Sequence, residues 1–206
     1  MYTAEEEVIN SATHFLSAIA SALFTILIVG NTSLSGMQTL GIFLVGLTGT
    51  WTFLSSYLYH SSKKSHKRIR NQILDKSSIY IMIGGNGAGV CMLSSSSVTS
   101  LIFCLLLVSI SCLLAANFCL KPKVTETFTL TSYLLLGWLA VIPASGLLMP
   151  SKFTDLPQLI FLLGGGVAYS LGVVFYVSEK KWYHTVWHGF TMLGFGLHLA
   201  GCYYCL

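Results

Sequence analysis

The chain is poor in charged residues. Asp, Glu, Lys and Arg together make up 9% of its 206 residues, whereas hydrophobic residues make up 54%. A soluble globular domain carries about 25% charged residues, so this composition excludes an ordinary soluble protein. The sequence therefore predicts an integral membrane protein.

Long polar stretches are also absent. A bilayer-spanning helix needs about 20 mostly apolar residues, and the sequence contains seven such stretches joined by short polar connectors. They cover residues 12–29, 37–59, 77–93, 98–117, 129–148, 156–177 and 184–206. We expect a single all-α domain over residues 1–206, a seven-transmembrane helix bundle with almost no extramembrane domain.

The start of the chain lacks the basic residues of a secretory signal peptide. It carries Glu5, Glu6 and Glu7 instead, so we expect the first apolar segment to remain in the mature protein. Thr3 and Glu6 have the spacing of a capping box, and acidic groups favour the positive end of a helix dipole. We interpret these acids as helix caps.

Basic residues are almost absent from one set of connectors. Of the 11 Lys and Arg residues, only Lys152 lies on that side, and the others lie on the alternate connectors. This asymmetry predicts a cytoplasmic N-terminus, an outer C-terminus and a multi-pass protein of the cell membrane. The net charge of +4 is thus a topology signal. Membrane lipids are the expected partners, and nucleic acid is not.

The six cysteines do not form a disulfide framework. Most of them lie in or beside apolar segments, where cysteine behaves as a small hydrophobic residue. Cys202 and Cys205 form a CxxC pair in the last segment. Packing is the favoured interpretation of this pair, and a redox pair is the alternative.

Histidines mark the ends of two apolar segments. His60 closes the second segment, and His184 and His188 open the seventh. Residues four apart on a helix share one face, with Cβ atoms about 5–6 Å apart. Asp75 begins the third segment. The distribution of Lys and Arg over the connectors places Asp75 and the three histidines near the cytoplasmic face. Ionisable groups at membrane depth are costly, so this group is the candidate functional site.

Three neutral imidazoles and a water are the ligands of a catalytic zinc site, because the fourth position stays open. Such a metal lowers the pKa of its water toward about 7 and polarises a substrate carbonyl. Asp75 would orient or deprotonate the water, and Ser56, one turn before His60, would support it. Spacing alone leaves alternatives open: the histidines can bond headgroups or backbone, and Asp75 can pair with Lys76 or Arg70.

Two further histidines are set apart from this site. His198 lies ten residues beyond His188, a helical rise of about 15 Å, so it cannot share the metal and is expected to serve the core. His14 shares a helix face with Glu7 and Asn10, which predicts a polar network against neighbouring helices.

Several blocks of the sequence resemble the hemolysin III-like proteins, the bacterial branch of the progestin and adiponectin receptor family. The resemblance spans nearly the whole chain with matching order and spacing. It rests on ExxNxxTH (Glu7, Asn10, Thr13, His14), SxxxH (Ser56, His60), Asp75 with Ile79 and Tyr80, Gly137 with Trp138, the run Gly164, Gly165, Tyr169, Gly172, Phe175 and Tyr176, and finally His184, His188 and His198.

This resemblance implies a seven-helix bundle with zinc bound by His60, His184 and His188, and with Asp75 near the metal water. Relatives resemble ceramidases, which implies a zinc-dependent membrane hydrolase of a lipid amide or ester near the cytoplasmic face. A non-enzymatic sensor or regulator of lipid or energy homeostasis with a structural zinc is the alternative. A cytolytic pore is disfavoured, because the fourth and sixth segments offer almost no polar lining.

One block departs from the family pattern. The family continues its third helix with a Gly-x-Tyr-Thr-Pro turn, whereas here Gly84 and Gly85 lead into Asn86, Gly87, Ala88 and Gly89. The block lacks the proline and is rich in glycine, so we expect the third helix to pack closely or to bend differently.

Overall fold

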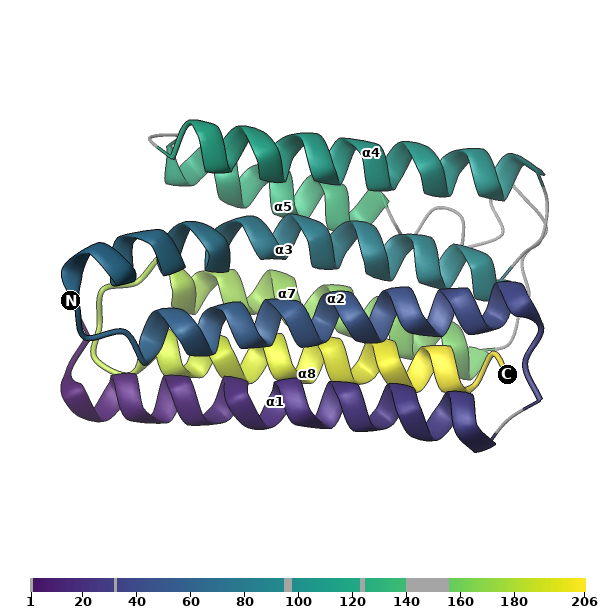
Figure 1. Cartoon of the computed structure of the whole chain (residues 1–206), viewed down its shortest axis with the longest axis horizontal. Coiled ribbons are helices and arrows are strands. Elements are labelled where there is room, and N and C mark those ends of the chain that lie inside the picture. The colour runs from purple at the N-terminus through teal and green to yellow at the C-terminus, as the bar shows by residue number, and fades with distance from the viewer. Residues whose placement is uncertain (1, 32, 95–97, 123–124, 140–155) are drawn as a thin grey trace.

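The computed structural model is an all-α bundle, as the sequence predicts. It describes residues 2–31, 33–94, 98–122, 125–139 and 156–206, and these form seven helices without a strand. The helices are α1 (Ala4–Asn31), α2 (Gly36–His60), α3 (Ser65–Ser94), α4 (Val98–Leu120), α5 (Glu126–Leu139), α7 (Leu156–Tyr176) and α8 (Tyr183–Tyr203). Residues 140–148 of the predicted fifth segment lie outside the described residues. The two chain termini lie at opposite ends of the bundle (Figure 1).

Four of the helices are long and apolar enough to cross a bilayer. These spans are Ala4–Gly30, Gly36–His60, Val98–Leu120 and Gln158–Tyr176. Large apolar side chains such as Leu23, Leu105 and Val174 are exposed on the outside of the bundle, where a bilayer would cover them. The fold is therefore that of a multi-pass membrane protein. Which side of the membrane each terminus faces stays a prediction.

Reciprocal capping boxes fix the starts of the first two helices. At α1, the Thr3 backbone N–H donates to the Glu6 carboxylate at 2.8 Å, and the Thr3 hydroxyl accepts from the Glu6 backbone. Ser35 and Gln38 make the same pair of bonds at α2. Each box satisfies backbone donors that a helix start otherwise leaves unpaired.

Small residues bring α3 close to both of its neighbours. A Cβ atom at Gly85 would come within 2.3 Å of the Thr48 hydroxyl of α2, and one at Gly84 within 2.7 Å of Ser111 of α4. At Gly89 it would lie 2.6 Å from the Gly41 carbonyl of α2. The glycine-rich block therefore lies in one continuous helix and allows close packing, which is one of the two outcomes expected for it.

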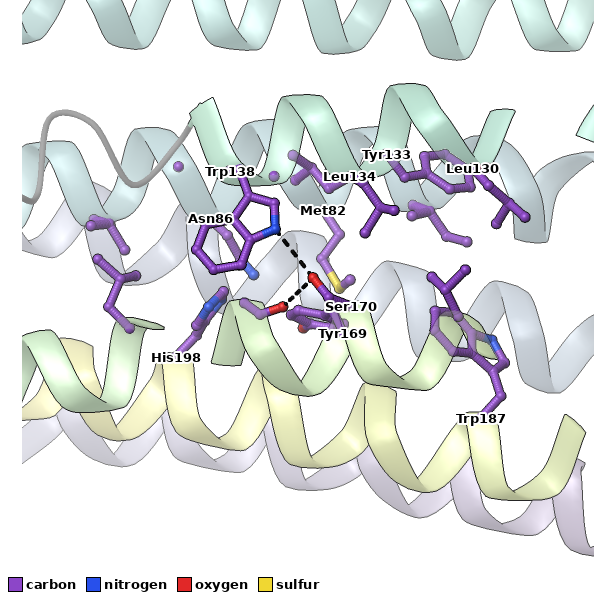
Figure 2. Close-up of a pocket in the computed structure, with 18 residues that line it drawn as sticks. Met82, Asn86, Leu130, Tyr133, Leu134, Trp138, Tyr169, Ser170, Trp187 and His198 are labelled. Atoms are coloured by element: carbon purple, nitrogen blue, oxygen red, sulfur yellow. Dashed lines mark hydrogen bonds between the residues drawn. The ribbon is translucent and has the colours of Figure 1, made fainter. Parts of the chain in front are cut away.

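Polar bonds hold α5 to α3 and α7. The Trp138 indole N–H donates to the Ser170 hydroxyl at 3.1 Å (Figure 2). At the other end of α5, the Glu126 carboxylate accepts from Lys76 at 3.1 Å and from the Tyr176 hydroxyl at 2.8 Å. Burial alone would raise the pKa of Glu126, but these two donors hold it below its usual range.

The core follows the helix interfaces. Its largest cluster combines residues from α1, α2, α3, α7 and α8 and includes the buried Phe53, Phe195 and Cys202. The Cys205 thiol donates to the Gly201 carbonyl one turn earlier at 3.2 Å. This placement agrees with packing as the role of the CxxC pair.

Candidate metal centre

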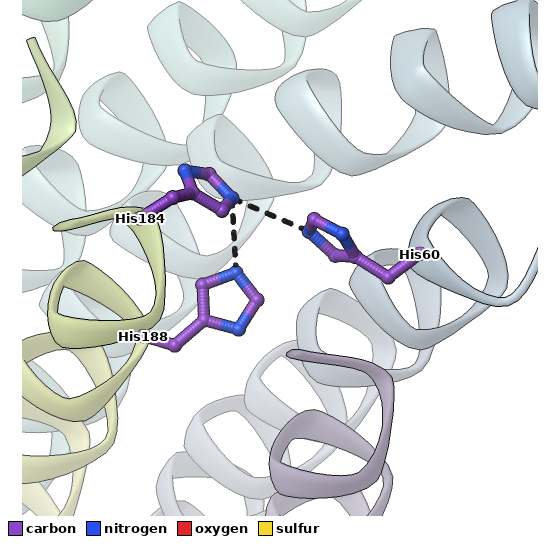
Figure 3. A group of neighbouring side chains, drawn as sticks. All are labelled: His60, His184 and His188. Carbon is purple, nitrogen blue, oxygen red and sulfur yellow. Dashed lines mark hydrogen bonds between the residues drawn. The ribbon is translucent and has the colours of Figure 1, made fainter. Parts of the chain in front are cut away.

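Three histidines converge at the end of the bundle that holds the N-terminus. His60 is the last residue of α2, whereas His184 and His188 lie on the first turns of α8. The Nε2 atom of His184 lies 3.3 Å from Nε2 of His60 and 3.2 Å from Nε2 of His188 (Figure 3). His60 and His188 are buried, with exposed fractions of 4% and 2%. The folded chain thus brings together the three predicted ligands from two helices.

The spacing of the three donor atoms fits a metal ion. Ligand nitrogens about 2.0–2.1 Å from a tetrahedral ion lie roughly 3.3–3.4 Å from one another. The donor atoms of all three histidines lie within 4.8 Å of one another, and two of the pairs already have the tetrahedral spacing. The group could therefore hold a metal ion.

An acid on α1 fixes the orientation of His60. The Nδ1 atom of His60 lies 2.6 Å from the Glu7 carboxylate, which can only accept, so Nδ1 carries the proton and donates. In the neutral ring this leaves the Nε2 lone pair directed at the other two histidines. A carboxylate behind an imidazole is the usual arrangement that orients a metal-binding histidine.

Arg68 completes this arrangement from α3. Its guanidinium donates to the second oxygen of Glu7 and lies over the Tyr59 ring, 4.5 Å from the ring centroid. Burial alone would lower the pKa of Arg68, but its contacts with Glu7 and Tyr59 raise the pKa above its usual value. The guanidinium therefore stays charged and forms an ion pair with the carboxylate that bonds His60.

The sequence does not identify this role of Glu7. Interpreting the three acids as helix caps describes Glu6 but not Glu7. The helical spacing places Glu7 only in a predicted polar network, on the face of α1 that it shares with Asn10 and His14. Its partner His60 is 53 residues away along the chain, so local spacing could not identify the pair.

The start of α8 is held by the start of α1. Trp182 has a positive φ of 70° immediately before α8, a conformation that residues other than glycine rarely adopt. The Glu6 carboxylate accepts the Trp182 backbone N–H at 2.7 Å. The Tyr2 ring stacks on the His184 ring with a centroid distance of 4.3 Å. These contacts fix the turn from which His184 and His188 project.

His14 lies closer to the site than its sequence position suggests. Its ring stacks on His188 with a centroid distance of 3.7 Å and an interplanar angle of 13°. The Thr191 hydroxyl lies 3.4 Å from its Nε2 atom, and the Thr185 hydroxyl donates to the Asn10 side chain at 2.7 Å. The predicted polar network thus joins α1 to α8. His14 itself lies outside the group of three possible ligands.

A cavity of about 1010 Å³ opens beside the histidines. His184, His188, Asp75 and Ser56 all line it. Asp75 lies beside Ser56 at this cavity and outside the ligand group. Of its two possible basic partners, Lys76 is paired with Glu126, and the ion pairs of the described residues include none between Asp75 and Arg70.

A second, smaller cavity adjoins the first inside the bundle. It has a volume of about 90 Å³ and mostly apolar walls, and six residues line both spaces. The shared residues are Ile79, Met82, Leu130, Tyr133, Tyr169 and Trp187. The polar site therefore lies next to an apolar space that reaches His198.

The comparison with known proteins agrees with this architecture. The sequence model of a family described as haemolysin-III related matches residues 2–199. The chain belongs to this family. It is 29% identical over 215 residues to a hemolysin-3 homolog of Bacillus subtilis (strain 168), across 100% of this chain and 95% of that protein. It is also 27% identical to hemolysin-3 of Bacillus cereus, across 92% of this chain and 87% of that protein.

Membership of the haemolysin-III related family confirms the class of the protein and its place in the membrane. The matched residues, 2–199, include the three histidines, Asp75 and Ser56. The assignment of His60, His184 and His188 as metal ligands, and of Asp75 and Ser56 as catalytic residues, stays a prediction.

Proposed function

We propose that this family member is a zinc-dependent membrane hydrolase of a lipid amide or ester. The observation that carries the proposal is the convergence of three imidazole nitrogens beside a large cavity. His184, His188 and the carboxyl-bearing Asp75 line this cavity, and a smaller apolar cavity adjoins it. Imidazole is a preferred ligand of zinc, and three such ligands leave one position for water. The metal would supply an activated water and polarise the substrate carbonyl.

Three side chains of the protein would carry out the other steps of the reaction. Asp75 accepts the proton of the attacking water and returns it to the leaving amine or alcohol, so amide or ester plus water gives acid plus amine or alcohol. Ser56 lines the same cavity, and its hydroxyl would orient the Asp75 carboxylate. Glu7 keeps His60 in the tautomer that has a free Nε2 atom.

The substrate class is inferred from the two adjacent cavities. The larger one is lined at the end of the bundle by the exposed side chains of Glu179, Lys180 and Lys181. The smaller one is apolar and lies among α3, α5, α7 and α8. A molecule with a polar head and a long apolar chain fits this combination, because each part meets surface of its own kind.

Hydrolysis by the purified full-length protein tests the proposal. We expect one zinc ion per chain and release of fatty acid from a panel of lipid amides and esters in nanodiscs. The Asp75→Asn variant should retain the metal and lose turnover by about 100-fold or more, because general acid-base catalysis contributes 10²–10⁴-fold. Glu179→Gln, which changes another carboxylate of the same cavity, should retain turnover and serves as the control.

A structural metal is the second candidate, and one observation favours it. The three histidines join the end of α2 to the start of α8, so a metal held by them would fix these helices together. In that case zinc removal lowers the thermal stability while Asp75→Asn has no effect on any activity. Zinc binding without hydrolysis of any lipid in the panel would favour this sensor or regulator function over the hydrolase.

The names of the Bacillus relatives point to cytolysis as a third activity. The exposed surface of α4 is dominated by leucine and isoleucine side chains, which suit contact with lipid and not a water-filled pore. Ion leakage from liposomes that contain only this protein would establish the pore function.

A further inference from the structure

The smaller cavity contains polar atoms that have no partner. Asn86 Oδ1, Tyr169 Oη and both ring nitrogens of His198 are buried and make no hydrogen bond within the described parts of the chain. All three residues line the cavity of about 90 Å³. We call them the deep polar cluster. Figure 2 shows His198 reaching from α8 and Asn86 from α3 into the same space.

These atoms stand out from the other polar groups around the cavity. The Trp138 indole is bonded to Ser170, and the Tyr133 hydroxyl is bonded to the Lys76 carbonyl at 2.5 Å. The His198 ring lies beside the Leu162 backbone carbonyl, yet neither nitrogen attains hydrogen-bond geometry. An unsatisfied buried polar group costs about 1–3 kcal/mol. Three of them around one cavity therefore indicate a ligand that completes their bonds.

The helix packing presents these atoms to the cavity. Asn86 is only 6% exposed and lies in the glycine-rich block of α3, where Gly84 and Gly85 bring the backbone against α4 and α2. On α8, the His198 ring is packed on Gly165 of α7, where a Cβ atom would come within 2.4 Å of Nε2.

The chemistry of the cluster selects the ligand. Asn86 Oδ1 accepts a hydrogen bond, the Tyr169 hydroxyl donates or accepts, and a neutral imidazole does one of each. None of the described residues that line the cavity carries a formal charge, so the site disfavours an ion. A hydroxyl group both donates and accepts and is neutral. The volume holds about three water-sized groups, which suits a hydroxyl and the adjoining carbons of a chain.

The depth of the cluster indicates where that hydroxyl lies on its molecule. His198 is ten residues beyond His188 on α8, a rise of about 15 Å. A lipid with its head beside the three histidines would therefore bring the middle or far part of its chain to the cluster. The six shared lining residues show that the two cavities lie next to each other, so such a chain has only these side chains to pass.

We propose that the deep polar cluster is a second binding site, which recognises a hydroxyl group carried on the apolar chain of a lipid. The proposal rests on the proposed function only in taking the ligand to be a lipid that enters from the three-histidine end. It requires binding and no turnover.

Binding of matched fatty acids to the purified protein tests this site. The probes are stearic acid and hydroxystearic acids of equal length with the hydroxyl near the carboxyl, in mid-chain or near the methyl end. Affinity is measured by native mass spectrometry or by thermal stabilisation in nanodiscs of a neutral phospholipid. We expect the mid-chain isomer to bind about tenfold more tightly than stearic acid, because the hydroxyl completes hydrogen bonds that the cluster otherwise lacks.

Substitutions within the cluster identify the site. Tyr169→Phe, Asn86→Leu and His198→Phe should bind stearic acid like the wild type and lose the preference for the hydroxylated chain. Tyr133→Phe is the matched control, since its hydroxyl is already bonded to the Lys76 carbonyl, and it should keep the preference. Thermal unfolding of each variant shows that it is folded.

Two results would overturn the site. Equal affinity of the wild type for all chains means that water alone satisfies the cluster, and a preference retained in all three variants places hydroxyl recognition elsewhere. The result of this binding test does not depend on hydrolase activity. A preference for the hydroxylated chain without hydrolysis would contradict only the hydrolase function. Hydrolysis without such a preference would contradict only the deep binding site.

Discussion

The three-histidine cluster and the deep polar cluster both bury nitrogen and oxygen atoms inside the bundle, but they differ in how those atoms are satisfied. In the first, Glu7 accepts a hydrogen bond from His60 and is itself held by Arg68, and the His184 ring stacks on Tyr2. The His188 ring stacks on His14, while its Nδ1 atom makes no hydrogen bond among the described residues. In the second, Asn86, Tyr169 and His198 are left without bonds among the described residues. The first arrangement is built to keep a fixed geometry for a small ion. The second is suited to a ligand that binds reversibly.

Removal of a histidine from the first cluster should have the largest effect. His184→Ala and His188→Ala each delete one of the three ligands, so we expect metal content to fall from one ion per chain to a small fraction of that. Elemental analysis of purified protein measures it. His66→Ala is the control, because His66 is exposed on the first turn of α3, away from the three ligands. An unchanged metal content per chain in both variants would mean that the three-histidine cluster is not a metal site and does not differ from the deep polar cluster in this respect.

Loss of the acid behind His60 should have the next largest effect. Glu7→Gln retains the shape of the side chain and removes its charge, so we expect metal affinity to fall by about 10–100-fold, as for other partners of metal-bound histidines. Competition with a chelator measures the affinity. Glu5→Gln changes an exposed acid of the same helix turn, 3.8 Å from Lys181, and should leave the affinity unchanged. Equal effects of the two changes would argue for a general charge effect.

A smaller effect is expected from the residue that supports Asp75. Ser56→Ala should leave the metal in place and reduce hydrolysis several-fold, because Asp75 loses a hydrogen bond and some of its fixed orientation. Ser55→Ala is a close control, since the Ser55 hydroxyl donates to the Trp51 carbonyl of its own helix at 2.7 Å. Rates measured at saturating lipid separate this effect from weaker binding. The hypothesis fails if both variants have the same rate.

The smallest effect should come from the deep polar cluster. Tyr169→Phe removes a hydroxyl that has no partner, so the free energy of unfolding should stay the same or rise by up to about 1 kcal/mol. Tyr133→Phe removes a hydroxyl that is bonded to Lys76 and should lower it by about 1 kcal/mol. Unfolding in mixed detergent micelles compares the two. Destabilisation of the same size in both variants would show that Tyr169 is not unsatisfied in the folded protein.

Much of the site could be predicted because its ligands obey local spacing. His184 and His188 are four residues apart, which places them on one helix face whatever the rest of the chain does. His60 and Asp75 came from their positions at the ends of apolar segments. Glu7 could not be assigned in this way, because Glu5, Glu6 and Glu7 have the same chemistry and only the approach of α2 and α3 selects one of them.

By itself the sequence determined the class of the protein and the positions of its helices, because low charge and long apolar runs leave a chain few stable forms outside a membrane bundle. It also indicated which residues could bind a metal. Only the tertiary structure decided what surrounds them: that Glu7 orients His60, that His14 stacks on His188, and that Asn86 and His198 meet at one cavity. These contacts join helices far apart in the chain, and their geometry depends on how closely glycine and serine allow those helices to pack.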